Sequence, residues 1–375
     1  MMRWTAILSV VFAALAPRLH SQEAATKPPT DGWVLTTPAS VGLSAEPLAA
    51  MEKAIRAGEF KKIGSVLIAR QGKLGYEGYF EGDAFTLRDT RSATKSITDI
   101  LVGIAIAERR LAGVDARILS YLPERATKIQ NPDPRKDKIT VEDFLTMSSA
   151  LECDDWNDAS RGNEERMYLV EDWAQFILDL PVRGRMHLGE KADPPPYGRD
   201  FSYCTGGVFT LSEVLQKATG VRTDRYAQEK LFGPLGITDA TWVYSPMNIP
   251  QTGGGLRLTS RELLKIAELY RTRGEWRGHR IVDEAWVKKS TQPHARIDDD
   301  TEYGYLWWLK TFKSGSKSYA AFFMSGNGGN KVMVFPDLDM TVVLTSTNFN
   351  TKRHAPADRA AAHRLHPAGS GKLAC

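Results

Sequence analysis

The spacing of apolar positions divides the chain into three parts. Residues 48–60 have helical spacing, and Ile63–Arg70 and residues 73–80 read as two strands joined by a Gln71-Gly72 turn. A long middle region then follows a helical period, in the segments 92–108, 141–147, 171–180, 206–219, 223–231 and 260–273. Strand-like runs return at 303–311, 319–324, 331–335 and Met340–Ser346.

Strand-rich ends around a helical middle predict an α+β fold. We expect one antiparallel sheet built from both chain ends, with flanking helices and an inserted all-helical subdomain. The sheet lobe would comprise about residues 33–91 and 300–350, and the helical lobe about residues 92–299. Thr259 and Glu262 have the spacing of a capping box before the last of these helices. A cleft between two such lobes is a favoured place for a small-molecule site.

The first residues resemble an export signal. Met1-Met2-Arg3 is a short basic start, and residues 4–16 form an apolar run too short to span a bilayer comfortably. Ser21 offers a small residue before Gln22 for cleavage. We therefore expect residues 1–21 to be a signal peptide and residues 22–375 a periplasmic or secreted domain, with no stable membrane span after processing. The alternative is an uncleaved N-terminal anchor.

Composition narrows the function classes. The net charge is +4 and the Lys and Arg residues are scattered, which argues against nucleic acid as a partner. Cys153, Cys204 and Cys375 have no metal-ligand spacing and cannot all pair, so we expect no disulfide framework. The chain has no HExxH motif and no Cys/His cluster, so we expect no metal and no cofactor.

The candidate chemistry begins at Ser92-Ala93-Thr94-Lys95. Residues three apart on a helix share one face, and a helix N-terminus favours developing negative charge. A lysine whose charge is suppressed by burial can take the serine proton. A second Ser-x-x-Lys, at residues 314–317, lies in a Ser/Gly/Lys run between two predicted strands and is interpreted as a hairpin loop.

Two later stretches can complete such a site. Tyr203 lies on a loop that enters a predicted helix, and a tyrosine beside a lysine can act as a proton carrier. Residues 325–330, Ser-Gly-Asn-Gly-Gly-Asn, lie between two strands, where glycines let a substrate approach the backbone.

Together these residues resemble the serine β-lactamase-related superfamily, which includes class C β-lactamases, DD-peptidases, family VIII carboxylesterases and oligoamide hydrolases. The resemblance runs from about residue 35 to 350 and is carried by Ser92-x-x-Lys95, Tyr203, Gly-Gly-Gly-Leu at 253–256, and residues 144–149, 232–236, 303–308 and 335–339. It implies that Ser92 is the acylated nucleophile, Lys95 its proton acceptor and Tyr203 the proton shuttle. It also implies an oxyanion hole formed by the backbone of Ser92 and of the strand near Asn327. From their places in the strands we expect Gly326, Gly328 and Trp308 beside the substrate.

Two departures bear on the substrate. Many β-lactamases have Tyr-x-Asn where this chain has Tyr203-Cys204-Thr205, and Lys-Thr-Gly where this chain has a cation-free Ser325-Gly326-Asn327-Gly328, Lys331 being the nearest cation. We therefore favour a neutral acyl ester of small or medium size as the substrate. A β-lactam or peptide-type amide cleaved by the same residues is the second hypothesis, and a catalytically silent protein that binds acyl or peptidoglycan-like ligands is the third.

The remaining candidates receive structural interpretations. Cys204 is expected to be a small buried thiol. Trp307 and Trp308 should divide between core and cleft. Glu152, Asp154, Asp155 and Trp156 are expected in a solvated loop at the cleft rim, and His187, His279 and His294 are expected to be surface or structural residues.

Overall fold

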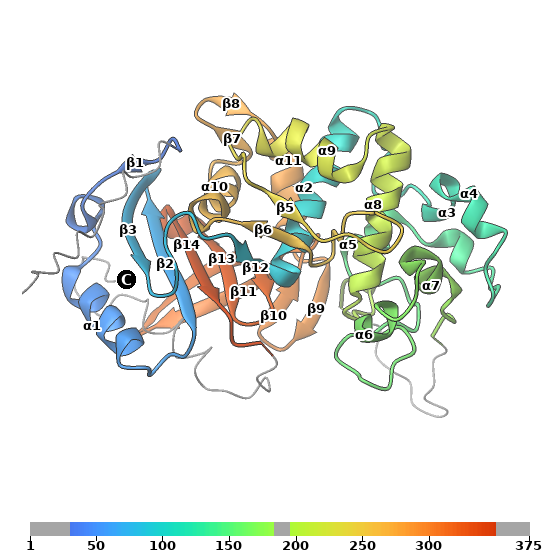
Figure 1. Cartoon of the computed structure of the whole chain (residues 1–375), viewed down its shortest axis with the longest axis horizontal. Helices are drawn as coiled ribbons and strands as arrows, with labels where there is room; N and C mark the ends of the chain where they lie inside the picture. Colours follow the sequence, from blue (N-terminus) through green and yellow to red (C-terminus); the bar gives the residue numbers. More distant parts are fainter. Residues whose placement is uncertain (1–30, 184–195, 350–375) are drawn as a thin grey trace, which may run out of the picture. The chain divides into compact units, whose positions relative to one another are not determined.

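The computed structural model describes residues 31–183 and 196–349, and within them the strand-like runs assemble into one large sheet (Figure 1). Its strand order is β1-β3-β2-β14-β13-β12-β11-β10-β9. The strands are β1 (Val34–Leu35), β2 (Ile63–Arg70), β3 (Lys73–Tyr79), β9 (Ala295–Asp298), β10 (Thr301–Tyr303), β11 (Trp308–Ser314), β12 (Lys317–Gly326), β13 (Asn330–Phe335) and β14 (Met340–Ser346).

The two ends of the chain meet where β2 pairs antiparallel with β14. All neighbouring pairs in this sheet are antiparallel except β1 and β3, which pair in parallel. The predicted α+β fold is therefore confirmed, as are the β2–β3 hairpin at Gln71-Gly72 and the hairpin loop between β11 and β12 that contains the second Ser-x-x-Lys.

The predicted strand at 303–311 is divided by a tight turn. Gly304 N–H donates to the Trp307 carbonyl at 2.8 Å, so β10 ends at Tyr303 and β11 begins at Trp308. In this turn the Leu306 N–H donates to the Leu145 carbonyl, and the Leu306 carbonyl accepts the Ser96 hydroxyl. The turn gives the backbone of Leu306 hydrogen-bond partners on two helices. The spacing of apolar residues along the chain does not predict such long-range contacts.

The middle of the chain supplies most of the helices. They are α1 (Ala45–Arg56), α2 (Thr94–Ala107), α3 (Ile118–Tyr121), α4 (Pro123–Ala126), α5 (Val141–Leu145), α6 (Glu164–Met167), α7 (Trp173–Asp179), α8 (Thr205–Thr219), α9 (Thr223–Ala227), α10 (Ser260–Arg271) and α11 (Glu284–Ser290). The same region also holds short strands, in the sheet β4 (Arg88–Asp89), β6 (Leu256–Leu258) and β5 (Thr241–Trp242) and in the hairpin of β7 (Glu275–Trp276) and β8 (His279–Arg280).

Helix α2 lies at the centre of the larger core. Ile97, Ile100 and Leu101 are fully buried because this helix contacts both α8 and β12. Helix α10 covers β13 and β14, and it begins with the predicted capping box of Thr259 and Glu262. A second, smaller apolar cluster joins α1 to the other face of the sheet. Because α2 packs against both α8 and β12, the start of α2 lies next to the end of β12.

Several predicted features lie outside the described residues: the signal peptide at 1–21, His187 and the tail beyond residue 350. Among the helices that the structure describes, none has both the length and the apolarity needed to cross a membrane.

Candidate active site

Ser92 and Lys95 stand at the entry to α2. Ser92 lies in a 3-10 turn, Arg91–Ala93, and Lys95 lies in the first turn of the helix that follows. The Lys95 side chain is 1% exposed, and its Nζ donates to Ser92 Oγ at 2.9 Å. The nucleophile–base contact expected from the sequence is therefore present.

The other acceptors of Lys95 come from distant segments. Nζ donates to Thr205 Oγ1 at 2.9 Å and to the Gly253 carbonyl at 2.5 Å. A Cβ on Gly253 would lie 2.7 Å from Thr205 Cγ2, so the glycine permits this approach. All three acceptors are uncharged, so no carboxylate among the described residues is hydrogen-bonded to Lys95 Nζ.

Tyr203 also contacts Lys95. Its ring is 6% exposed, and Lys95 Nζ lies 4.9 Å from the ring centroid. The tyrosine is on the loop that enters α8, as predicted, since that helix begins at Thr205. Within the part of the chain that the structure describes, the Tyr203 hydroxyl has no hydrogen-bond partner, so the lysine faces the ring rather than the hydroxyl.

Thr205 is a site residue that sequence reasoning missed. It stands where many β-lactamases have the Asn of Tyr-x-Asn, and its hydroxyl bonds Lys95 as described above. The departure from the motif is visible in the sequence, and a threonine hydroxyl can accept a hydrogen bond from the lysine as an amide oxygen can.

The end of β12 approaches the Ser92 turn very closely. A Cβ on Gly326 would lie 2.1 Å from the Thr90 carbonyl, so only glycine fits there. Asn330 strengthens this contact, because its Nδ2 donates both to the Asp89 carbonyl and to the Asn327 carbonyl at 3.1 Å. Gly326, which we predicted to face substrate, thus packs against the Ser92 turn.

Two backbone donors are available at this junction. Neither the Ser92 N–H nor the Asn327 N–H donates a hydrogen bond to any of the described residues. The Asn327 side chain is exposed and accepts from the Gly328 N–H at 2.7 Å. The role of Asn327, Gly326 and Gly328 at substrate stays a prediction, which these two N–H groups make geometrically feasible.

The strand at 325–328 carries no cation of its own, and Lys331 is its neighbour on β13, as the sequence indicates. Lys331 lies directly opposite Ser325 in the antiparallel pair β12–β13, and its Nζ donates to Ser325 Oγ at 2.6 Å. A role for Lys331 at substrate is not implied by this contact.

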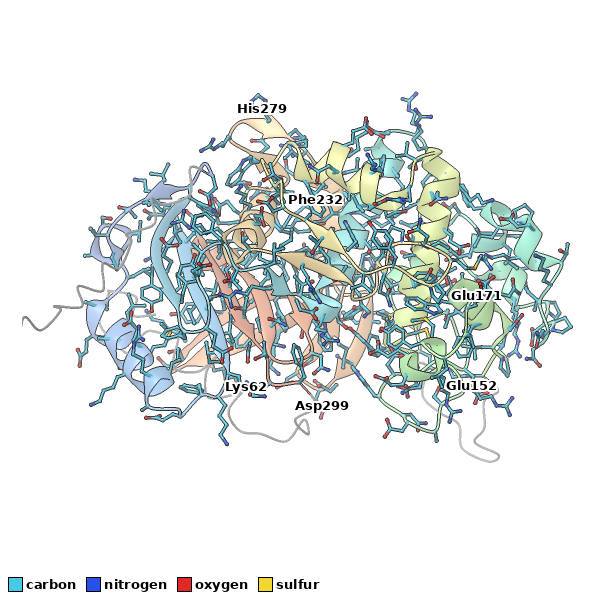
Figure 2. All side chains as sticks on the ribbon, in the orientation of Figure 1. Lys62, Glu152, Glu171, Phe232, His279 and Asp299 are labelled. Carbon is cyan, nitrogen blue, oxygen red and sulfur yellow. A yellow bond between two sulfur atoms is a disulfide. The ribbon has the colours of Figure 1, made fainter. Side chains whose placement is uncertain are left out.

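The expectation that Cys204 is a free buried thiol is wrong. Cys153 and Cys204 form a disulfide, drawn as a yellow bond in Figure 2, across a sequence separation of 51 residues. The Trp156 ring stacks on Tyr203, with centroids 5.3 Å apart and planes at 9°. Asp155 N–H donates to the Tyr203 carbonyl at 2.8 Å, and Ser202 Oγ donates to the Cys153 carbonyl at 2.6 Å. The loop at 152–156 therefore contacts the segment that carries Tyr203, while residues 156–159 are exposed to solvent as expected.

Asp155 is a carboxylate whose charge interacts electrostatically with Lys95, although the two side chains are not hydrogen-bonded. Its Oδ2 accepts from the Thr205 N–H at 2.6 Å and its Oδ1 from the Glu164 N–H at 3.0 Å. Burial, reinforced by the negative charge of Glu164, raises the pKa of Asp155 to about 7, although Lys95 and the Thr205 N–H act in the opposite direction. Asp155 therefore changes charge near neutral pH.

The two adjacent tryptophans separate as predicted. Trp307 is fully buried, and its Nε1 donates to Asp99. Trp308 is partly exposed and lies 6.0 Å from the Tyr203 ring and 6.3 Å from Trp156, measured between centroids. Trp308 and Trp156 form an aromatic wall beside Tyr203. His279 lies at the outer end of the β7–β8 hairpin (Figure 2), and His294 stacks on Tyr305, so neither belongs to the site.

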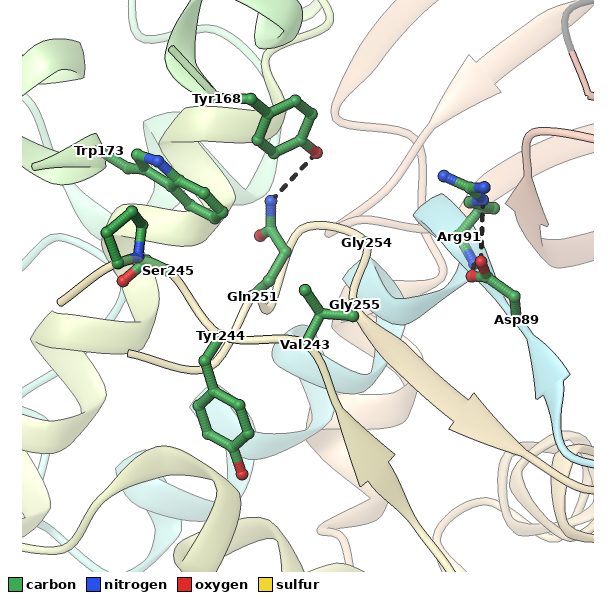
Figure 3. A pocket seen from close by; sticks show the side chains of 11 residues that line it. Asp89, Arg91, Tyr168, Trp173, Val243, Tyr244, Ser245, Gln251, Gly254 and Gly255 are labelled. Carbon is green, nitrogen blue, oxygen red and sulfur yellow. Dashed lines mark hydrogen bonds and ion pairs between the residues drawn. The ribbon is translucent and has the colours of Figure 1, made fainter. Parts of the chain in front are cut away.

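A cavity of about 520 Å³ lies next to Asp89 and Arg91, the residues just before Ser92 (Figure 3). It is lined by Asp89, Arg91, Tyr168, Trp173, Val243, Tyr244, Ser245, Pro246, Gln251, Gly254 and Gly255. Gln251 links it to the catalytic centre, since its Oε1 accepts from the Gly253 N–H and its Nε2 donates to the Tyr168 hydroxyl.

Comparison with known proteins identifies the family. The model of the family described as "Beta-lactamase" matches residues 52–366. The chain belongs to the beta-lactamase family. This beta-lactamase-family protein is 22% identical over 280 residues to a 6-aminohexanoate-dimer hydrolase of Paenarthrobacter ureafaciens, which covers 68% of the chain and 65% of that relative. It is 28% identical to a monacolin J acid methylbutanoyltransferase of Aspergillus terreus, over 53% of the chain and 52% of the relative.

The match therefore spans less than two thirds of the length of either curated relative. Among solved structures, EstCE1, described as a hydrolase with promiscuous acyltransferase activity, superposes on the beta-lactamase-family protein with a TM-score of 0.65 at 14% identity, covering 87% of this chain and 100% of that one. At that identity the likeness shows the fold alone.

Proposed function

We propose that the protein is a serine acyl hydrolase that cleaves small or medium acyl esters through a covalent acyl-enzyme on Ser92. The observation that carries this proposal is the 2.9 Å hydrogen bond between Ser92 Oγ and the buried Lys95 Nζ. Nucleophile and base side chains within hydrogen-bond reach are the signature of nucleophilic catalysis. Family membership supports a hydrolase of this type.

In acylation, Ser92 Oγ bonds to the acyl carbon while the serine proton passes to Lys95. The developing oxyanion is stabilised by the N–H groups of Ser92 and Asn327, each worth about 2.7–4 kcal/mol in comparable sites. The bond from the acyl carbon to the leaving oxygen then breaks, and the proton held by Lys95 passes to that oxygen with Tyr203 as the proposed carrier. For this transfer the Tyr203 hydroxyl must come within hydrogen-bond distance of Lys95 Nζ, which contacts the Tyr203 ring in the structure. Deacylation reverses these steps with water as nucleophile and regenerates the Ser92 hydroxyl.

Amide cleavage is the second candidate, and one observation favours it. The name of the 6-aminohexanoate-dimer hydrolase describes the hydrolysis of an oligoamide-type substrate, and it is among the curated relatives of this chain. The third candidate, a silent binding protein, keeps the fold without turnover.

One set of measurements separates these three. We expect a fluorophosphonate probe to label Ser92 and a short p-nitrophenyl ester to be hydrolysed faster than a chromogenic cephalosporin or a linear amide. Ser92→Ala and Lys95→Ala should each lower turnover at least about a thousandfold. Tyr203→Phe should do nearly as much, whereas Asn327→Ala, which keeps the backbone donor, should have a mild effect. Absence of labelling at Ser92 supports the silent protein, and faster amide or cephalosporin turnover supports the second candidate.

We also propose that the protein is exported to the periplasm or secreted. The basic and apolar start of the chain supports this, and so does the Cys153–Cys204 disulfide, because disulfides persist in oxidising compartments. Cell fractionation of the full chain, compared with a chain lacking residues 1–21, tests it. Equal distribution of both forms between fractions contradicts export.

A further inference from the structure

We propose that the cavity beside Ser92 binds the acyl part of the substrate and that Arg91 selects acyl groups ending in a carboxylate. This inference rests on the proposed function, since it names the substrate class of the same site. It also changes the substrate expected from the sequence, which was a neutral ester.

The cavity is assigned to the acyl group by exclusion of the leaving group. Tyr203 donates the proton to the departing oxygen, so the leaving group lies on the Tyr203 side, between Trp156 and Trp308. None of these three residues lines the cavity. Its walls are Arg91 and Asp89 on one side and Tyr168 and Trp173 on the other (Figure 3). Arg91, the residue before Ser92, is what joins the cavity to the Ser92 turn.

The walls of the cavity combine apolar surface with a single charged pair. Val243 and Trp173 offer contacts for a hydrocarbon chain, whereas Arg91 and Asp89 are the charged residues among the described residues of the lining. A chain that begins at Ser92 and ends at this pair would have an apolar body and a polar terminus.

Arg91 is oriented with its donors available. Its backbone N–H donates to Asp89 Oδ1 at 3.1 Å, and its Nε lies 3.1 Å from Asp89 Oδ2. Its guanidinium stacks on the Phe349 ring at 4.4 Å. The side chain is nevertheless 46% exposed, and within the described residues neither Nη1 nor Nη2 donates a hydrogen bond. Asp89 thus pairs with Nε of the guanidinium, and Nη1 and Nη2 remain available to donate to a planar anion such as a carboxylate, which Arg binds well.

Two substrates that differ in one group test this inference. We expect kcat/KM for p-nitrophenyl hydrogen glutarate to exceed that for p-nitrophenyl pentanoate by about tenfold, since a hydrogen bond to a charged group contributes about 1.5–3 kcal/mol. Arg91→Gln should abolish this ratio and Arg91→Lys should retain part of it. Added salt should lower the ratio for the wild-type protein.

Arg135→Gln is the matched control. Arg135 pairs with Asp133 in the same Asp-x-Arg arrangement, with its own N–H on Asp133 Oδ1 at 2.9 Å, but it lies outside the cavity. This variant should keep the wild-type ratio. Equal kcat/KM for the two esters in the wild-type protein, or an equal loss of both in Arg91→Gln, overturns the inference.

Binding separates this inference from the proposed function. In a Ser92→Ala background, which cannot turn over, calorimetry should detect glutarate, and adding Arg91→Gln should weaken it about tenfold. If no ester is hydrolysed but glutarate binds through Arg91, only the proposed function fails. If esters are hydrolysed and glutarate does not bind, only the present inference fails.

Discussion

At the scale of single residues, the site holds a carboxylic acid that ionises near neutral pH. Ionised Asp155 can accept from both the Thr205 N–H and the Glu164 N–H, and its charge favours the Lys95 ammonium formed when Ser92 loses its proton. Because the pKa of Asp155 is raised to about 7, the carboxylate loses its charge as the pH falls through this value. The charged groups that face it are Lys95 from α2 and Glu164 from α6.

We therefore expect kcat/KM to fall on the acidic side of about pH 7 and Asp155→Asn to abolish that limb. The variant should have about tenfold lower kcat/KM at pH 8, since its amide oxygen replaces only one of the two acceptors. A pH–rate profile from pH 5 to 9 measures this. Asp158→Asn, an exposed residue of the same loop, should keep the wild-type profile. If Asp155→Asn shows the same fall of kcat/KM at acidic pH as the wild-type protein, a group other than Asp155 causes that fall.

At the scale of elements, the segments 153–156 and 202–205 are held together by contacts of Cys153, Asp155 and Trp156. The disulfide, the Ser202–Cys153 and Asp155–Tyr203 hydrogen bonds, and the Trp156–Tyr203 stack all act on the loop that presents Tyr203 to Lys95. The position of Tyr203 and the stability of its loop therefore depend on the same contacts.

The double variant Cys153→Ser/Cys204→Ser should lose stability and activity together. Opening a loop of this length costs about 4 kcal/mol in the chain-entropy treatment, and kcat should fall several-fold because the remaining contacts hold Tyr203 less firmly. Calorimetry and ester turnover, with dithiothreitol treatment of the wild-type protein alongside, measure both. Cys375→Ser should change neither quantity. A double variant with wild-type Tm and kcat contradicts this coupling.

A second junction joins β12 to the Ser92 turn through Gly326. A Cβ there would meet the Thr90 carbonyl at 2.1 Å, which is backbone and cannot rotate away. Gly326→Ala should therefore displace the Asn327 N–H from the Ser92 N–H and lower kcat about a hundredfold, the typical loss for one oxyanion donor. Gly315→Ala, in the β11–β12 hairpin, is the control: the added Cβ meets nothing within 4 Å, so this variant has only the local strain of a φ of 57° and should keep wild-type kcat. Active Gly326→Ala protein would show that the strand has room to shift.

At the scale of the whole molecule, the sequence predicted what local spacing determines. Helices such as α8 and α10 and strands such as β2 and β14 follow from apolar period and capping residues close in the chain. The Ser92–Lys95 contact followed from helix geometry, and Tyr203 from a motif. The disulfide, the Lys331–Ser325 contact and the role of Asp155 could not be predicted, because each depends on a partner delivered by another element. The split of residues 303–311 was missed for the same reason: Leu306 satisfies groups on α2 and α5.

Asp99 joins three such elements behind the active site. It lies on α2, its Oδ2 accepts from the Tyr270 hydroxyl of α10 at 2.8 Å, and it also accepts from Trp307 Nε1 at 3.0 Å, next to β11. Its Oδ1 has no partner among the described residues. Complete burial raises the pKa of this carboxyl from 3.8 to about 8, so the folded protein keeps a proton that the unfolded chain has lost.

The raised pKa of Asp99 makes the protein less stable toward unfolding as the pH rises. Between about pH 4 and pH 8 unfolding releases this proton, so rising pH favours the unfolded state and stability falls by up to about 1.4 kcal/mol per pH unit. Asp99→Asn keeps an acceptor for Tyr270 and Trp307 but cannot ionise, so urea unfolding at pH 5, 6, 7 and 8 should show a markedly smaller slope than in the wild-type protein. Asp155→Asn should reduce the slope only up to about pH 7, and Asp158→Asn should leave it unchanged. An Asp99→Asn protein with the wild-type slope would mean that the buried carboxyl is already ionised at pH 5 and that water or a cation reaches Oδ1.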